Sequence, residues 1–251
     1  MVKIMKIYNL YSMKTDLNFK TNNENNKYIS VKKTVINNKI SKTIIFKNLN
    51  YKIKVKKILI KEIKYFFNIL GITNNDHIFI VGIGNDTHTA DSVGPKILKH
   101  IKVNSFLNNL GIKIKGNKVS TLEPGVLGET GILTSKIIKS VSEEIKPDLV
   151  ILIDSFISED IDLLNKTIEI NNYGIDTGIG IKEINSSINN ELLNCKILTI
   201  GVITGVELSL SKEKDKNYIP YLLTSKDIDS YVNEISLLIA DAINTSIESL
   251  N

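Results

Sequence analysis

Two aspartates lie in sequence surroundings that suit acid–base chemistry. Asp154 directly follows a run of five apolar residues, so its carboxyl group is expected at the lip of a hydrophobic sheet, where an unpartnered charge is costly. Asp91 lies just before an expected helix start, where backbone N–H groups and the helix dipole favour negative charge. If the two carboxyl groups converge, they titrate as a coupled pair, and one can take a proton from water while the other donates one. Such a pair can hydrolyse an amide without a metal.

Each of these features also has a plainer interpretation. Asp91 could serve as the N-cap of the helix that begins near Ser92, and composition alone favours this at least as strongly as catalysis. Asp154 could simply accept hydrogen bonds from loop amides. The glycine-rich turn at residues 82–84 could bind a nucleotide, but the third glycine of GxGxxG is missing at the required offset and no GKS or GKT follows.

Histidine and cysteine offer little metal or nucleophile chemistry. His88 could be a metal ligand, but His77 and His100 fall in other expected elements without ligand spacing, so a surface histidine is the favoured interpretation. Cys195 is the only cysteine, which excludes an internal disulfide and a CxxC metal site. Its apolar surroundings predict a buried small hydrophobic residue rather than a nucleophile. There is no Ser–His–Asp arrangement and no GxSxG elbow. We therefore predict no metal site and no cofactor.

The strands that would position the aspartates follow from hydrophobic patterning. Continuous apolar runs at residues 77–81, 149–153 and 197–203 predict buried parallel strands, the second of which ends at Asp154. Residues 28–57 alternate β-branched and polar side chains, which predicts a β-rich N-terminal segment. In open parallel sheets, catalytic groups gather at the carboxyl ends of the strands. Both aspartates are therefore expected at one edge of the sheet.

Helices are predicted between and around these strands. The last one should begin with a capping box at residues 224–227. It should turn four side chains inward: Val232, Ile235, Ile239 and Ala242. The other predicted helices cover residues 58–70, 95–101 and 130–145. Alternation of strands and helices predicts an α/β fold with a doubly wound, mostly parallel sheet flanked by helices.

Composition bounds the class of protein. A chain of 251 residues with 42% hydrophobic and 24% charged residues suits one α/β domain over residues 1–251, with polar loops at residues 20–27 and 211–217. No apolar run approaches the ~18 residues that a membrane span needs, and the N-terminus lacks a signal-peptide core, so we expect a cytoplasmic protein. The net charge of +5 comes from scattered lysines, so no nucleic-acid partner is expected.

Five stretches, in the same order, resemble the germination proteases of spore-forming bacteria. GIGNDTHTADSVGP at residues 82–95 is similar to the family's GxGN…TPDALGP, and EPGVLGETGILTS at residues 123–135 is similar to APGVMGxTGIETS. KPDLVILIDS at residues 146–155 resembles KPDxVIAIDAL. YSMKTDL at residues 11–17 resembles YSVRTDL, and residues 165–180 resemble NTTIQIxDTGIHPGSG.

This resemblance implies an aspartic endopeptidase that degrades small acid-soluble spore proteins at germination. The two catalytic aspartates of the family fall on Asp91 and Asp154. The resemblance also implies a tetramer in the forespore or spore core, made as a zymogen, for which residues 1–10 would be the prosegment. The matching motifs contain residues expected to shape the site: Gly82, Gly84, Asn85, Gly94, Pro124, Gly125 and Gly128.

Two further comparisons leave alternatives open. Hydrogenase maturation endopeptidases are distantly similar, and their acidic metal-binding positions also fall on Asp91 and Asp154, which allows a metal-dependent processing peptidase. The chain also departs from the germination protease pattern. IGVPTVVDA becomes IGVITGVEL at residues 200–208, and HPGSGVGNKR is eroded at residues 176–182. We expect residues 203–207 to form an altered loop, which allows a catalytically weak or non-proteolytic paralogue.

Overall fold

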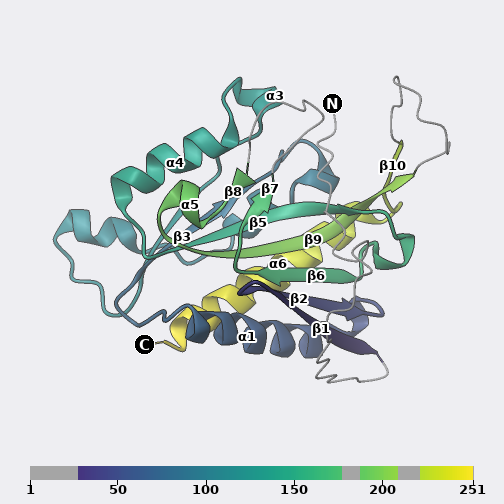
Figure 1. Cartoon of the computed structure of the whole chain (residues 1–251), viewed down its shortest axis with the longest axis horizontal. Helices are drawn as coiled ribbons and strands as arrows, with labels where there is room; N and C mark the ends of the chain where they lie inside the picture. The colour runs from purple at the N-terminus through teal and green to yellow at the C-terminus, as the bar shows by residue number, and fades with distance from the viewer. Residues whose placement is uncertain (1–27, 177–186, 209–220, 251) are drawn as a thin grey trace.

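A mixed β-sheet with helices on both faces organises the chain (Figure 1). The computed structural model describes residues 28–176, 187–208 and 221–250, so the predicted loops at 20–27 and 211–217 lie outside it. Eight strands of this part form one sheet in the order β1-β2-β6-β9-β5-β3-β4, with β10 paired to β9. The strands are β1 (Ile29–Ile36), β2 (Lys39–Phe46), β3 (His77–Gly82), β4 (Lys118–Leu122), β5 (Leu149–Ser158), β6 (Thr167–Asn171), β9 (Lys196–Leu208) and β10 (Tyr221–Leu223). A separate ladder joins β7 (Ile175–Asp176) to β8 (Ser187–Ile188).

Four parallel strands, β9-β5-β3-β4, form the part of the sheet that was predicted from apolar runs. Every residue of β5 is buried. A strand covered on both faces does not show the alternation of apolar and polar side chains, which is why residues 149–153 form a continuous apolar run in the sequence. The predicted α/β fold with a parallel core is confirmed.

The antiparallel half of the sheet begins with a β-rich N-terminal segment, as predicted, but this segment is shorter than residues 28–57. β1 and β2 form a hairpin around Asn37 and Asn38, whose φ angles of 48° and 65° suit a tight hairpin turn. β2 then pairs antiparallel with β6, and β6 with β9. Residues from Lys52 onward belong to helix α1 (Lys52–Ile69), where Val55 and Leu59 are buried at helical spacing.

The helices bury two separate cores. One face of the sheet packs against α1, α2 (Val93–Leu98) and α6 (Ile228–Glu248), and the other against α4 (Thr134–Ile145) and α5 (Asn190–Leu193). Figure 1 shows α1 and α6 on one side of the sheet and α4 and α5 on the other. The four side chains predicted to turn inward on the last helix are all fully buried. The remaining helical segments are α3 (Leu127–Thr130) and the 3-10 turns η1 (Leu49–Tyr51), η2 (Thr89–Asp91), η3 (Ser105–Leu110) and η4 (Ile161–Leu163).

Besides α1, three predicted helices differ in their boundaries. α6 begins at Ile228 without a side-chain cap, because Thr224 donates instead to the carbonyl of Thr204. The predicted helix over residues 130–145 is divided by Gly131, whose φ of 69° ends α3 before α4 starts. α2 ends at Leu98, earlier than predicted. Among the helices described, none is long and apolar enough to cross a bilayer.

Candidate functional site

Asp154 lies in β5 just beyond the point where the neighbouring strand β3 ends. The prediction that β5 ends at Asp154 is wrong, because the strand continues to Ser158. Its neighbour β3, however, ends at Gly82, which pairs with Ile153. From Asp154 onward β5 therefore keeps β9 on one side and has no β3 residue on the other. Asp154 is fully buried, and its Oδ1 accepts a hydrogen bond from the Ser155 amide at 2.8 Å.

The turn after β3 connects the two predicted aspartates. The Ile83 amide donates to the carbonyl of Ile153 at 2.8 Å, so the turn is fastened to the residue just before Asp154. Two residues later, the Asn85 amide donates to both the carbonyl and the Oδ2 of Asp91, at 3.1 and 3.0 Å. η2 also contacts β5 and β9. The segments that carry Asp91 and Asp154 thus meet at one edge of the sheet, with Asp91 half-buried.

Close backbone approach in this turn requires glycine. At Gly84, with φ at +135°, an added Cβ would lie 1.9 Å from the carbonyl oxygen of Asp91. An added Cβ at Gly82 would lie 2.5 Å from the carbonyl oxygen of Gly94, and one at Gly94 would lie 2.4 Å from that of Ile83. The turn can press against η2 and the start of α2 because these residues have no side chain.

The plainer interpretation of Asp91 as the cap of the following helix does not match the contacts. The N-cap of α2 is Ser92, and no side chain caps that helix. The Asp91 carboxyl group faces the Asn85 amide instead. Asp154 accepts a hydrogen bond from the amide of Ser155, which belongs to the same strand.

Side-chain hydroxyls hold η2 in place. Thr204 donates to the carbonyl of Ala90 at 2.6 Å, and Thr89 donates to Asp229 at 2.6 Å. Sequence reasoning missed Thr204 because residues 203–207 were expected to form a loop. They belong to β9, and the bond joins segments 114 positions apart, which no local pattern encodes.

The second glycine motif lies at the same edge of the sheet. β4 runs parallel to β3 with Leu122 opposite Val81, so the chain that follows β4 emerges beside the turn after β3. Pro124 is buried, and Gly125 has a φ of +67° that suits glycine. Gly128 differs, because it is exposed in α3 and an added Cβ would have no atom within 4 Å. Close packing therefore does not require glycine at this predicted site-shaping position.

The histidines do not cluster at this edge of the sheet. His88 is exposed, as predicted for a surface histidine. His77 is buried at the other end of β3, where its Nε2 lies 2.8 Å from the Ser120 hydroxyl and burial lowers its pKa. Within the described ranges, no three His, Cys, Asp or Glu side chains lie close enough to share a metal ion.

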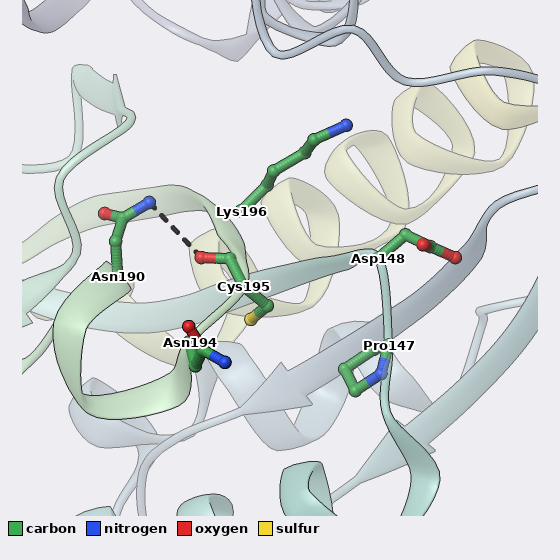
Figure 2. A pocket seen from close by; sticks show the side chains of 6 residues that line it. All are labelled: Pro147, Asp148, Asn190, Asn194, Cys195 and Lys196. Atoms are coloured by element: carbon green, nitrogen blue, oxygen red, sulfur yellow. Dashed lines mark hydrogen bonds between the residues drawn. The ribbon is translucent and has the colours of Figure 1, made fainter.

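A hollow of about 460 Å³ opens at the opposite edge of the sheet (Figure 2). It is lined by Pro147, Asp148, Asn190, Asn194, Cys195 and Lys196. Cys195 is half-buried rather than fully buried as predicted, and burial raises the pKa of its thiol to about 11. A thiol with this pKa is protonated at neutral pH and is a poor nucleophile. Because Asp148 precedes β5 and Lys196 begins β9, the hollow lies at the amino ends of these strands, away from Asp91 and Asp154.

Comparison with known proteins identifies relatives of one kind. The sequence profile described as germination protease matches residues 5–219. The chain is 31% identical over 242 residues to a germination protease of Clostridium tetani, covering 79% of this chain and 73% of that protein. It is 36% identical over 157 residues to germination proteases of Bacillus cereus and Bacillus anthracis, covering 61% of this chain and 43% of each of those proteins. The matched region thus spans less than half the length of the Bacillus relatives.

Proposed function

Since this chain belongs to the germination protease family, which indicates a peptidase, we propose that it is an endopeptidase of spore germination that uses Asp91 and Asp154 to activate water. The observation that carries the proposal is the pair of backbone links at the carboxyl edge of β3. Ile83 is bonded to the residue before Asp154, and Asn85 is bonded to Asp91. Two aspartates that are separated by 62 intervening positions in the sequence are thereby held at one edge.

The differing burial of the two carboxyl groups suggests how they would divide the work. Asp91 is partly open to solvent, so an attacking water can reach it, whereas Asp154 is fully buried. In the proposed reaction one carboxylate takes a proton from water as the oxygen attacks the scissile carbonyl. The other carboxyl group gives a proton to the departing amine. Loss of either group breaks this exchange of protons.

Substrate, activation, assembly and location are proposed from the family resemblance. The substrates are small acid-soluble spore proteins, and the enzyme is made as a zymogen from which residues 1–10 are removed. It assembles as a homotetramer in the forespore. Residues 1–10 and the motif at 11–17 lie outside the described part of the chain, so this proposal rests on sequence similarity.

A catalytically weak paralogue is the second candidate, because residues 203–207 depart from the family pattern. A metal-dependent processing peptidase is the third. One experiment separates the three. Full-length protein and a form beginning at Tyr11 are incubated with a small acid-soluble spore protein, with and without EDTA, and fragments are followed by mass spectrometry. The proposal predicts cleavage that EDTA does not change. Absence of cleavage by either form favours the weak paralogue, and activity that EDTA removes and one metal restores favours the metal-dependent peptidase.

A further inference from the structure

β9 contains an extra residue opposite β5, and that residue is Thr204. Phe156 pairs with Ile203 and Ile157 pairs with Gly205, so Thr204 has no register partner on β5. Such a bulge breaks the ladder locally and turns a side chain in a new direction. Thr204 is nevertheless buried, with 2% of its surface exposed.

The hydroxyl of this bulged residue reaches the segment that carries Asp91. Thr204 Oγ1 donates to the carbonyl of Ala90 at 2.6 Å, and that carbonyl belongs to the peptide group that joins Ala90 to Asp91. The carbonyl of Thr204 itself accepts from Thr224 Oγ1 at 3.0 Å. The bulge is thus bonded to Thr224, which directly follows β10, and to Ala90 of η2.

The other two hydroxyl hydrogen bonds described at η2 do not reach the sheet. Thr89 donates to Asp229 on α6 through exposed side chains, and Ser92 donates within the segment to the carbonyl of Thr89 at 2.8 Å. The Thr204 bond joins η2 to the sheet itself. The same strand pairs with β5 three residues earlier, where Gly201 lies opposite Asp154. β9 therefore contacts the segments that carry both aspartates: it pairs with β5 at Asp154, and it bonds to the residue before Asp91.

We propose that Thr204 is a positioning residue, whose hydroxyl fixes the peptide before Asp91 relative to β9 and so keeps the Asp91 carboxyl group in register with Asp154. This rests on the proposed function of the two aspartates. η2 is a 3-10 turn of three residues, whose hydrogen-bond geometry is poorer than that of an α-helix, so a bond to the sheet adds to what fixes it. A displacement of about 1 Å at a reacting group can cost roughly 10²-fold in rate.

The test compares two isosteric substitutions in one strand. Thr204→Val removes the hydroxyl and keeps the β-branched shape. Thr199→Val is the matched control, because Thr199 is fully buried in β9 and its hydroxyl has no hydrogen-bond partner among the described residues. With a small acid-soluble spore protein as substrate, Thr204→Val should lower kcat by about 10- to 100-fold with KM nearly unchanged. Thr199→Val should match the wild type, and Thr204→Ser should recover most of the activity.

A second measurement does not depend on turnover. Hydrogen exchange of the Asn85 amide reports the position of Asp91, because that amide donates to Asp91. Thr204→Val should speed exchange at Asn85 but not at Ile80 in β3, and Thr204→Ser should restore protection. Equal acceleration at both amides, or kcat and exchange at Asn85 equal to those of Thr199→Val, would overturn the positioning role. Asp91→Asn is assayed in parallel: if it keeps activity, the proposed function itself fails.

Discussion

At Asp91 and Asp154, changing a carboxyl group to an amide removes proton transfer and little else. Asp91→Asn and Asp154→Asn should each lower kcat by at least 10²- to 10⁴-fold while the far-UV spectrum and the unfolding transition stay close to those of the wild type. Peptide fragments quantified by mass spectrometry give the rates. Asp86→Asn is the matched control, because Asp86 lies in the same turn but forms an exposed ion pair with Lys99 at 2.7 Å. If the three variants cleaved the substrate equally well, the two-aspartate mechanism would be wrong.

Gly84 offers a second test at the scale of one residue. Gly84→Ala adds a methyl group 1.9 Å from the Asp91 carbonyl oxygen at a φ of +135°. The backbone must shift, so the free energy of unfolding should fall by roughly 1–3 kcal/mol and activity should fall with it. Gly128→Ala, in open space on α3, should change stability by less than about 1 kcal/mol. Urea unfolding of the two variants gives the comparison, and equal stabilities would contradict the steric argument.

Between the N-terminal hairpin and α1, the structure buries an ion pair. Lys42 on β2 bonds to Glu62 on α1, with side-chain exposures of 10% and 6%, and the Lys42 ammonium lies 3.5 Å from the Tyr65 ring centroid. The pair ties the antiparallel edge of the sheet to the helix that covers it. Removing one partner leaves a buried charge without its counter-ion.

Glu62→Gln should therefore lower the free energy of unfolding by about 3–5 kcal/mol. The exposed pair Lys52–Glu234 provides the control, and Glu234→Gln should change the free energy by less than about 1 kcal/mol. Chemical denaturation of both variants measures the difference. A Glu62→Gln protein as stable as the Glu234→Gln protein would show that the buried pair does not hold the hairpin to α1.

The local hydrophobic pattern of the sequence is sufficient to predict some strands and helices and insufficient to predict others. β3 and β5 contain apolar runs at residues 78–81 and 149–153 because both faces of each strand are covered, and such runs are visible in the sequence. The start of α1 was mistaken for strand because the short stretch at residues 51–55 fits a period of two as well as a helical period. The length of β9 and the contact of Thr204 with Ala90 depend on which strands become neighbours, and tertiary pairing of this kind leaves no local signal.

For the whole molecule, the proposed zymogen makes a separate prediction. Removal of residues 1–10 should raise activity on a small acid-soluble spore protein well above that of the full-length chain, because a short N-terminal segment can block a groove or hold a strand edge. The two forms are compared at equal concentration, with the Asp91→Asn version of the trimmed form as the blank. Equal activity of the two forms, together with no trimming in maturing spores, would contradict the zymogen proposal.

The pairing of β2 with β6 also sets an order of events during synthesis. The β1–β2 hairpin is local and can form as soon as it leaves the ribosome, but its partner strand is far along the chain: Ile40 and Asn172, which are hydrogen-bonded to each other, are 132 positions apart. Until β6 is made, β2 has an open edge that can pair with another nascent chain. Contacts this distant slow folding. The hairpin is thus synthesised well before the strand against which it docks.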